Sequence, residues 1–480
     1  MTTPETILDL TVERLGGEGQ AIAHHEGKVI LVEGGIPGEQ VRVRVQKSKK
    51  RYAKAVITEI LAKGDLRRDP PCSYFGTCGG CQWQHLDYAA QLAWKRQQVE
   101  DCFTHPVAIA YGELRNPVAA PRPYHYRNKM EFSFGERRWL TAAEIASDTD
   151  FTDAPALGLH VPGRYDRVLD IDHCLLQTPG ANHILREMRQ LFERYRPSIY
   201  QTRTHSGFLR HFVLRTAQHS SDSSAAQASE ESMVILVTSP PQSATDEALL
   251  HHLPEAFPLA TTVLHASTIS KAQVASGSLT TLRGNGYITE WLRGVQFRIS
   301  PFSFFQTNPS QAARLVDVVI EAVQPQPHQI LWDLYCGTGT LGLSLAAHVR
   351  QVIGIEIVAS AIEDARLNAA LNGLHQVQFW QQDMSQPTDL WAQLPSPDVV
   401  VVDPPRAGLD AETVQRLLRL APPRLVYVSC NPATQARDCA LLAAGFEIQS
   451  LQPVDMFPQT SHVENVATLV HRSPRLTGYP

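Results

Sequence analysis

The stretch of sequence that decides the fold lies at residues 329–347 of this 480-residue chain and reads QILWDLYCGTGTLGLSLAA. It opens with an apolar run of the length of a buried strand, and a helix is expected from residue 340 onward. The turn between them carries Gly337, Gly339 and Gly342 in the spacing G-x-G-x-x-G. Small residues let the backbone approach a ligand, and the helix N-terminus offers free N–H groups. The stretch therefore predicts a strand, a binding turn and a helix in succession.

Strands and helices alternate around this turn through the last third of the chain. An amphipathic helix is expected at residues 311–323. The elements expected after the turn are strand 351–356, helix 359–371, strands 376–381 and 398–402, helix 411–419, strand 424–429, helix 434–443 and a hairpin near 446–471. This order is typical of a doubly wound α/β domain with a parallel sheet. We expect such a Rossmann-like domain over residues 306–480.

Three acidic residues near the turn indicate which ligand it binds. Glu356 ends the strand after the turn, where a carboxylate can accept hydrogen bonds from both ribose hydroxyls. A nicotinamide dinucleotide would fit these features as well. Asp333 separates the two alternatives, because a carboxylate at this strand end would repel a pyrophosphate but suits the positive amino-acid tail of S-adenosylmethionine. Asp383 follows a later strand and is placed to meet the adenine amino group.

Reactive groups follow two further buried strands. The loop Asp403-Pro404-Pro405-Arg406 comes after four valines, and Cys430 comes after an apolar run of the same kind. Asp-Pro-Pro is typical of methyltransferases that hold a planar nitrogenous ring, and the prolines stiffen the loop. Amino-group methylases would need an aromatic residue where this chain has Arg406. This difference argues against methylation of an exocyclic amine.

Methylation of uracil C5 needs a different set of groups. The C5 carbon is too weak a nucleophile until a thiolate adds to C6, and a base must later remove the C5 proton. Cys430 and Glu464 satisfy this requirement, and Arg406 can stabilise the developing negative charge. For Cys430 taken alone, an inert cysteine at a strand end is the alternative.

Together these motifs closely resemble the RNA uracil-C5 methyltransferases. The matching segments are 303–308, 333–339, 403–409, 429–432, 455–458 and 462–464. The resemblance implies that Cys430 is the nucleophile and Glu464 the base that abstracts the proton. It assigns six positions to the cofactor S-adenosylmethionine: Gln306, Tyr335, Thr340, Glu356, Asp383 and Asp403. Relatives often have asparagine where this chain has Thr340. The threonine offers a hydroxyl for hydrogen bonding but lacks the amide of the asparagine.

The N-terminal segment, residues 1–62, consists of short alternating runs separated by glycine turns. This pattern predicts a small antiparallel β-barrel of the oligonucleotide-binding type. Seven basic residues and no acid lie between positions 42 and 54, which is either a solvated hairpin tip or a surface that faces phosphates. The segment resembles the TRAM domain of relatives that act on large ribosomal RNA. The tRNA-specific bacterial branch commonly lacks it.

A cluster of cysteines falls in the predicted central domain, residues 63–305, whose pattern is mostly strand-like. Its members are Cys72, Cys78, Cys81 and Cys174. Four thiolates can hold zinc or a [4Fe–4S] cluster, and the spacing alone does not decide between them. Relatives with this spacing hold a [4Fe–4S] cluster, so the resemblance implies one here. A structural or RNA-positioning role is expected, because methyl transfer from a sulfonium consumes no electrons.

Contacts with RNA are expected in the same central domain. Residues 121–129 mix basic and aromatic side chains, which suits single-stranded RNA, and they include Arg127 and Lys129. An ordinary strand entry is the alternative. Phe304 is a candidate to stack on bases near the target. The target uridine must leave its helix, because a carbon inside a helix cannot reach a cysteine.

Composition narrows the class of protein. The net charge of −5 means that binding of nucleic acid depends on local basic patches. No secretion signal or long apolar run is present, so a cytoplasmic protein without membrane association is expected. We expect no obligate protein partner. Residues 141–156 and 218–232 have the composition of surface insertions.

The sequence thus predicts an S-adenosylmethionine-dependent enzyme that makes 5-methyluridine in RNA, with 23S ribosomal RNA as the preferred substrate. A tRNA uracil-C5 methyltransferase with the same chemistry is the first alternative. A nicotinamide-dependent iron–sulfur oxidoreductase is a distant third, since it leaves Cys430 and Glu464 without roles. A non-catalytic RNA-binding protein is disfavoured because the full catalytic set is present.

Overall fold

The glycine-rich turn leaves β18 (Ile330–Leu334) in the middle of an eight-stranded sheet, and α6 (Thr340–Leu345) follows it. The computed structural model describes residues 6–17, 19–105, 107–147, 154–219, 229–386 and 389–472. The sheet has the order β20-β19-β18-β21-β22-β24-β23-β7. Its remaining strands are β7 (Tyr111–Leu114), β19 (Gln351–Glu356), β20 (Val377–Gln381), β21 (Val399–Val402), β22 (Arg424–Ser429), β23 (Phe446–Val454) and β24 (Glu464–His471).

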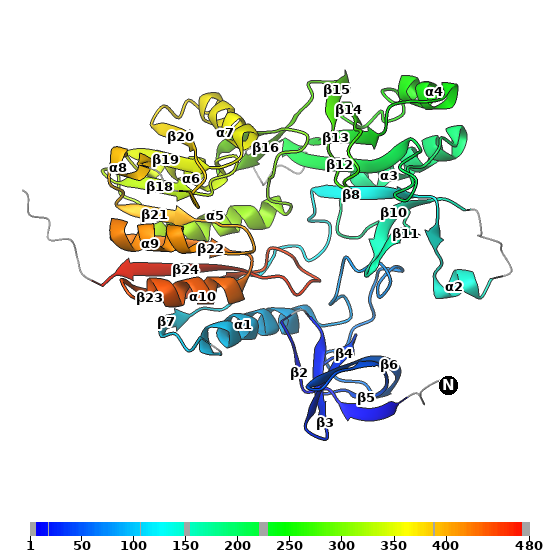
Figure 1. Ribbon diagram of the computed structural model, residues 1–480, viewed down its shortest axis with the longest axis horizontal. Helices are drawn as coiled ribbons and strands as arrows, with labels where there is room; N and C mark the ends of the chain where they lie inside the picture. Colours follow the sequence, from blue (N-terminus) through cyan, green and yellow to red (C-terminus); the bar gives the residue numbers. More distant parts are fainter. Residues whose placement is uncertain are drawn as a thin grey trace, which may run out of the picture.

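The first five strands in this order are parallel, whereas β24 runs antiparallel to both β22 and β23. Helices cover both faces, as a parallel sheet requires, and all four valines of β21 are buried. One face packs against α5 (Pro309–Val323), α6 and α7 (Ala359–Leu371). The other packs against α9 (Ala411–Leu420) and α10 (Pro432–Leu442) (Figure 1). The predicted Rossmann-like fold is therefore confirmed.

Two elements from early in the chain complete this C-terminal sheet. The helix α1 (Tyr88–Thr104) lies against α10 and contributes Val99 and Phe103 to its core. The short strand β7 pairs with β23 in parallel and forms the edge of the sheet. This packing differs from the predicted division of the chain, which placed residues 63–305 in the central domain. Val99 and Phe103 are the physical reason, since both side chains are buried in the core of the C-terminal sheet.

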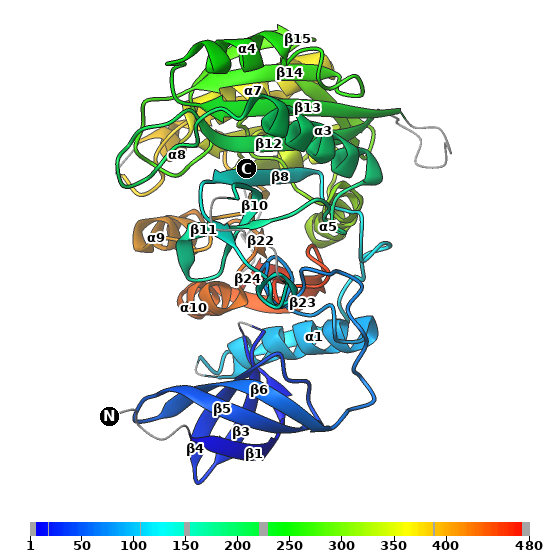
Figure 2. The ribbon, with the colours of Figure 1, turned by 90° about the vertical axis from the view of Figure 1, so that its right-hand side faces the viewer.

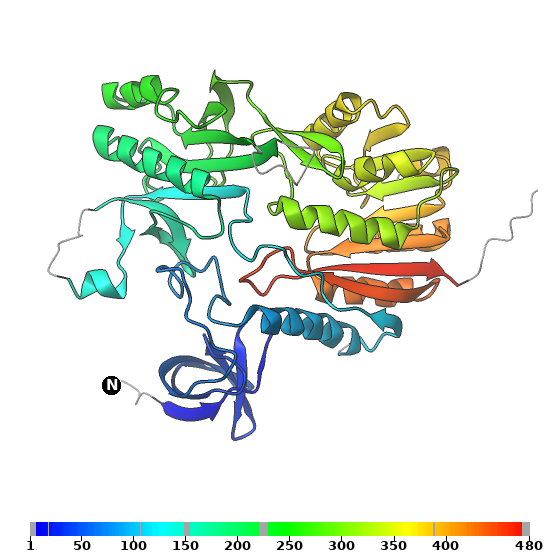
Figure 3. The same ribbon diagram turned by 180° about the vertical axis from the view of Figure 1, so that it is seen from behind.

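The central domain is built on a second eight-stranded sheet, of order β15-β14-β13-β12-β8-β10-β11-β9. Its strands are β8 (Lys129–Gly135), β9 (Arg138–Trp139), β10 (Ala156–Val161), β11 (Arg164–Asp170), β12 (Leu209–His219), β13 (Ser229–Thr238), β14 (Thr262–Ser267) and β15 (Ser278–Arg283). The helices α3 (Pro179–Tyr195) and α4 (Ala244–His252) cover one face around Phe212 and Phe257 (Figure 3). Strands predominate as predicted, but the strand-like reading missed both helices.

Short elements join these layers. One of them is a hairpin, formed by β16 (Ile288–Leu292) and β17 (Val295–Ile299), which follows the central sheet in the sequence and precedes the C-terminal helices and strands. Its strand β16 contacts β12, and its strand β17 contacts α7. The helices α2 (Ala142–Ile145) and α8 (Leu390–Gln393) are single turns. Of the two predicted insertions, residues 148–153 and 220–228 lie outside the described residues, and the flanking residues include α2, the end of β12 and the start of β13. No helix in the part of the chain that the structure describes could span a membrane.

The N-terminal segment forms a six-stranded sheet of order β1-β5-β6-β4-β3-β2. The strands are β1 (Ile7–Thr11), β2 (Arg14–Leu15), β3 (Ala21–His25), β4 (Lys28–Glu33), β5 (Gln40–Ser48) and β6 (Tyr52–Ala62). They enclose their own core of small and branched residues such as Ala21, Val32 and Val43, and the curled sheet sits beneath α1 in Figure 2. Trp83 and Leu86, which precede α1, close this core.

Candidate active site

A cavity of about 1500 Å³ opens at the carboxyl ends of the central strands of the C-terminal sheet. Its lining includes all the predicted catalytic and cofactor residues, namely Gln306, Tyr335, Thr340, Glu356, Asp383, Asp403, Cys430 and Glu464. Arg406, Phe304 and Arg127 line it as well. Lys129 does not, because the chain enters β8 there, and its carbonyl accepts a hydrogen bond from Arg127 Nε at 3.0 Å.

The glycine turn brings a buried carboxylate to the floor of this cavity. Gly342 N donates to Asp333 Oδ2 at 2.8 Å, and a Cβ on Gly342 would lie 2.8 Å from the same oxygen. Asp333 Oδ1 is buried and has no hydrogen-bond partner among the described residues. Burial raises the pKa of Asp333 to about 7, and the charges of Asp403 and Glu356 add to this rise. A cationic group placed here would stabilise the ionised carboxylate.

Glu356 ends β19 on the opposite side of the turn, and its carboxylate is held by backbone N–H groups. Gly337 N donates to Oε2 at 3.1 Å, whereas Ile357 N and Val358 N donate to Oε1 at 2.8 and 2.9 Å. This network fixes the carboxylate at the strand end. Asp383 is fixed in a similar way, since Ser385 donates to its Oδ1 through both N and Oγ.

The thiol of Cys430 lies between the end of β22 and the start of α10, in an electrostatic field set by three neighbours. Burial raises its pKa to about 11, the negative charges of Glu464 and Asp403 add to the rise, and the Arg406 cation opposes it. Burial also raises the pKa of Glu464 to about 8, again with Asp403 adding and Arg406 opposing. Burial raises the pKa of Asp403 to about 7. Arg406 is therefore the group that favours the ionised forms of both the thiol and the carboxyl.

The loop that carries Arg406 is docked on the first turns of α10. The carbonyl of Arg406 accepts hydrogen bonds from Asn431 Nδ2 and Thr434 Oγ1, both at 3.2 Å. Arg437 Nη2 donates to the carbonyl of Ala407 at 2.8 Å. Because α10 begins two residues after Cys430, these bonds hold the arginine loop against the same helix end as the thiol.

A buried carboxylate completes this docking. Asp438 Oδ2 accepts hydrogen bonds from Leu409 N and from the Tyr427 hydroxyl, each at 2.7 Å. Gly408 has a φ of +81°, and a Cβ there would lie 2.4 Å from the same carboxylate oxygen. Only glycine fits this position, because the left-handed backbone and the close approach both exclude a side chain.

The four predicted cysteine ligands line a second cavity, of about 220 Å³. Burial raises the pKa of Cys78 to about 11 and of Cys81 to about 12, and the other thiols add to each rise. Burial also raises the pKa of Cys174. Buried thiols that oppose one another's ionisation suit a positively charged metal group, which would stabilise the thiolates. Within the described residues, no three His, Cys, Asp or Glu side chains form a group that could hold a metal ion, so the four thiols share one cavity without being arranged there as metal ligands.

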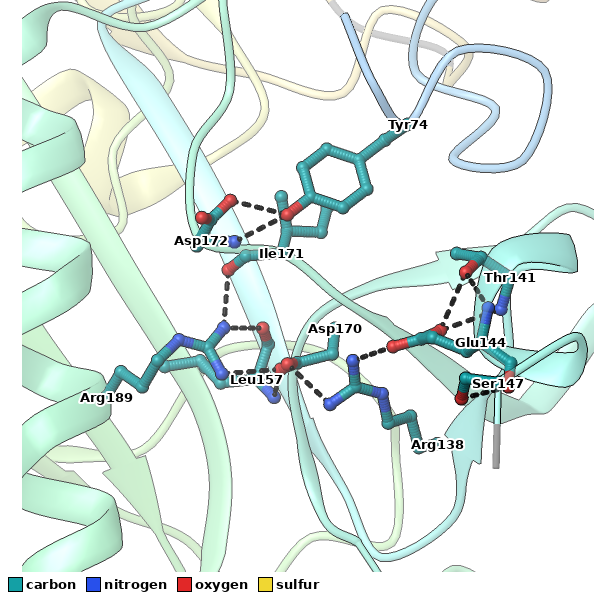
Figure 4. A network of polar contacts seen from close by, with 10 residues as sticks. All are labelled: Tyr74, Arg138, Thr141, Glu144, Ser147, Leu157, Asp170, Ile171, Asp172 and Arg189. Carbon is teal, nitrogen blue, oxygen red and sulfur yellow. Dashed lines mark hydrogen bonds and ion pairs between the residues drawn. The ribbon is translucent and has the colours of Figure 1, made fainter. Parts of the chain in front are cut away.

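Polar contacts fix the two chain segments that supply these cysteines (Figure 4). The Tyr74 hydroxyl, from the loop of Cys72 to Cys81, donates to Asp172 and accepts from Asp172 N at 3.2 Å. Arg189 of α3 donates to the carbonyl of Ile171 at 2.6 Å and to Asp170 Oδ1 at 2.7 Å. The segment before Cys174 is thus held from both sides.

The cysteine loop also forms a wall of the large cavity. Gly79, Gly80 and Arg127 line both cavities, and Gln82 lines the large one. Sequence reasoning did not anticipate this shared wall. It also gave no role to Phe457, Thr460 and His462, which line the large cavity from the β23–β24 loop. The matching segment 455–458 was the available signal, but sequence alone does not show which way its side chains face.

Comparisons with known proteins agree with this geometry. The model of the tRNA (uracil-5-)-methyltransferase family matches residues 269–390 and 392–472, and the TRAM domain model matches residues 2–58. An uncharacterized RNA methyltransferase of Chlorobaculum tepidum is 41% identical over 459 residues, which is 92% of this chain and 91% of the relative. A relative from Bacteroides thetaiotaomicron with the same description is 36% identical and covers 95% of this chain and 99% of its own.

Among solved structures, the Pyrococcus abyssi tRNA (uracil-54, C5)-methyltransferase in complex with S-adenosyl-L-homocysteine superposes with a TM-score of 0.74. It is 29% identical and covers 96% of this chain and 100% of its own. The likeness extends over the barrel, the central domain and the catalytic sheet together. The chain therefore belongs to the RNA (uracil-5-)-methyltransferase family and carries the TRAM domain.

Proposed function

We propose that this protein methylates C5 of a uridine in RNA with S-adenosylmethionine, and that 23S ribosomal RNA is its substrate. One observation carries the proposal: Cys430, Glu464 and the predicted cofactor residues line a single cavity. A thiol and a carboxyl on one wall, with a cofactor turn on the other, are what C5 methylation of uracil requires. If the protein were a nicotinamide-dependent oxidoreductase, neither the Cys430 thiol nor Glu464 would have a role.

The cofactor site is supported by the unpaired Asp333 Oδ1, which suits the ammonium of an amino-acid tail. Glu356 and Asp383 stand at the strand ends where ribose and adenine would lie. S-adenosylmethionine, when bound, supplies a methyl group that is ready for attack by a carbon nucleophile. The pair of adjacent acids, Asp333 and Asp403, favours a cationic ligand over a pyrophosphate.

The chain's own residues would then act in two stages. The Cys430 thiolate forms a bond between Sγ and uracil C6, and the electron pair of the C5–C6 double bond moves to C5 and O4. After C5 has gained its methyl group, Glu464 takes the C5 proton. The electrons of the broken C5–H bond restore the C5–C6 double bond, and the Sγ–C6 bond breaks to release the thiolate. Arg406 stabilises the negative charge at each stage.

Phe304 is suited to hold the everted base region, because 69% of its surface is exposed at the cavity. Such exposure is unusual for a phenylalanine and supports stacking on a nucleobase.

On the barrel, Arg42 forms ion pairs with Asp9 and Glu59, whereas Lys47, Lys49, Lys50 and Arg51 are exposed near the β5–β6 turn. These four side chains, and not Arg42, are the candidates for phosphate contacts.

We also propose that Cys72, Cys78, Cys81 and Cys174 hold a [4Fe–4S] cluster, which supports the cavity wall and takes no part in methyl transfer. Reconstitution with iron and sulfide should give the broad visible absorbance of a cluster. Tight binding of one zinc ion with no such absorbance would contradict this part of the proposal.

A tRNA substrate is the second candidate, because the Pyrococcus abyssi tRNA (uracil-54, C5)-methyltransferase matches 96% of this chain in structure. Incubation with labelled cofactor and separate pools of unmodified ribosomal RNA and tRNA distinguishes the two. We expect label in 5-methyluridine of the 23S RNA. Label confined to tRNA would show that tRNA is the substrate, and the proposed chemistry would be unchanged.

A further inference from the structure

The loop that leads to Glu464, residues 455–463, is held by bonds from distant parts of the chain. We call this segment the base loop. Four successive carbonyls each accept a hydrogen bond: Met456 from Asn308 at 3.0 Å, Phe457 from Lys95 at 3.0 Å, Pro458 from Tyr126 at 3.0 Å, and Gln459 from Gln82 and Trp83 at 2.9 and 3.0 Å. The donors come from the cysteine segment, α1, the central domain and the start of α5. Such dense anchoring fixes the path of the loop.

A buried ion pair begins the base loop. Lys95 Nζ of α1 contacts Asp455, and both side chains are 0% exposed. The Tyr88 hydroxyl donates to the other oxygen of Asp455 at 2.8 Å. A buried ion pair gives little net stability compared with apolar residues of the same size, because both charges lose their hydration. We therefore expect this ion pair to fix the position of the base loop on α1 and to add little to the stability of the fold.

Gln91, one turn before Lys95 on α1, forms a reciprocal pair with Gln459. Gln91 Nε2 donates to Gln459 Oε1 at 3.0 Å, and Gln459 N donates to Gln91 Oε1 at 3.0 Å. Gln459 has a φ of +69°, which an L-residue rarely adopts. The amide pair thus holds the base loop in a backbone conformation that it would not keep by itself.

The anchors lie close in sequence to the reactive carboxyl. Val454 and Glu464 face each other as partners in the β23–β24 pairing, and Asp455 follows Val454 directly. The residues Phe457, Thr460 and His462 of the base loop also line the cavity. A shift of the base loop would therefore move the carboxyl of Glu464 relative to a bound base.

We propose that Lys95 and Gln91 are positioning residues that hold the base loop so that Glu464 meets the C5 proton. This inference rests on the proposed role of Glu464. Neither residue touches the substrate, since neither lines the cavity. They act on the last stage, removal of the proton and release of the thiol, and not on the formation of the Sγ–C6 bond.

The test uses the full-length protein, labelled S-adenosylmethionine and the RNA pool that accepts methyl groups. In a Lys95→Met/Asp455→Asn variant both charges are removed together. We expect release of methylated RNA to slow by about 100-fold, the effect of a small misplacement of a reacting group. Methyl transfer into the covalent protein–RNA adduct should stay within about threefold of the parent, so labelled adduct should accumulate on a denaturing gel.

A second variant, Gln91→Met, perturbs the same loop and keeps the ion pair, so it decides the question should the double variant fail to fold. Leu249→Ala is the matched control, because it truncates a fully buried leucine of α4, remote from the base loop. It should lower the melting temperature without accumulating adduct. A folded Lys95 or Gln91 variant that releases product at the parental rate would overturn the inference.

Glu464→Gln separates this inference from the proposed function. If Glu464→Gln accumulates adduct and the folded loop variants do not, then only the positioning role fails. If Glu464→Gln itself turns over normally, the assigned base is wrong and the positioning role falls with it. If adduct accumulates in both Glu464→Gln and the loop variants but not in Leu249→Ala, the inference is supported.

Discussion

Cys430 and the four cysteines at the small cavity carry the same functional group in opposite settings. Burial raises the pKa of Cys430, Cys78, Cys81 and Cys174. Beside Cys430, the Arg406 cation opposes the rise. Around Cys78 and Cys81 the neighbouring thiols reinforce it. A single thiol beside a cation suits a nucleophile. Four thiols that share one cavity need more positive charge than the Arg127 cation beside Cys174 supplies, and they suit a metal group that brings it.

The largest effect is expected at the proposed nucleophile. Cys430→Ala should bind cofactor and RNA but lower the rate of 5-methyluridine formation by about 10⁴-fold or more, because no other group can add to C6. Product analysis after digestion of the RNA measures this loss. Cys102→Ala, at a partly buried thiol of α1 outside both cavities, should keep the parental rate. An active Cys430→Ala protein would show that Cys430 is not the nucleophile, and the comparison with the four other cysteines would then have no functional meaning.

The next effect concerns the proposed metal group. Cys81→Ser should lose bound iron and sulfide and should lower the stability of the reconstituted protein, on the order of 5 kcal/mol, since metal binding is linked to folding. Iron analysis and thermal unfolding measure the two quantities. The residual protein should still methylate, more slowly, because Cys430 is intact. Unchanged iron content would show that Cys81 is not a ligand.

A smaller effect is expected when the cation beside Cys430 is removed. Arg406 lowers the pKa of both Cys430 and Glu464, so Arg406→Gln should raise both values. Both groups act in their ionised forms, and the rising limb of kcat/KM against pH should therefore move to higher pH. At a pH below the midpoint of this limb, kcat/KM should fall about tenfold for each pH unit by which the limb moves. Arg419→Gln, at an exposed arginine of α9, should leave the profile in place.

Asp438→Asn tests the docking of the arginine loop in the same experiment. It keeps the shape of the side chain but weakens the bonds that Leu409 N and Tyr427 donate. The expected shift has the same sign as that of Arg406→Gln and is smaller, because the cation remains. A profile identical to the parent would mean that this buried carboxylate serves stability alone.

The smallest effect concerns stability against pH without cofactor. Burial raises the pKa of Asp333 and Asp403 to about 7 and of Glu464 to about 8. Carboxyls with raised pKa values bind protons more tightly when folded, so their contribution is full below about pH 4 and is lost as the pH rises through 7 and 8. The melting temperature should fall by roughly a few degrees between pH 6 and pH 9. Glu464→Gln should flatten the upper part of this decrease.

Local sequence patterns were sufficient for the five parallel strands β18 to β22 of the catalytic sheet. The strand expected at 329–334 and the helix expected at 340–347 appear as Ile330–Leu334 and Thr340–Leu345, because their period and glycine turn are local properties. The strand ends that carry Cys430 and Asp403 meet at one cavity for the same reason.

Contacts between distant segments were beyond the reach of such patterns. Lys95 and Asp455 are 360 positions apart, and nothing in either neighbourhood marks them as partners. Lys129 was expected to contact RNA together with Arg127, yet only Arg127 lines the cavity, because the chain turns into β8 between them. The helices α3 and α4 were missed since their apolar residues were read as strand residues within a strand-rich region.

The order of strands in the catalytic sheet has a consequence for biosynthesis. β24, residues 464–471, lies between β22 and β23. Among the strands that the structure describes, β7, made about 350 residues earlier than β24, pairs with β23 alone. A growing chain must therefore keep β7 and the side of α1 that packs against α10 without their partners until almost the whole sequence has left the ribosome. Contacts of such long range slow folding and leave apolar surface open in the meantime. The catalytic half of this enzyme is thus expected to mature late and to depend on chaperones more than the barrel at its N-terminus does.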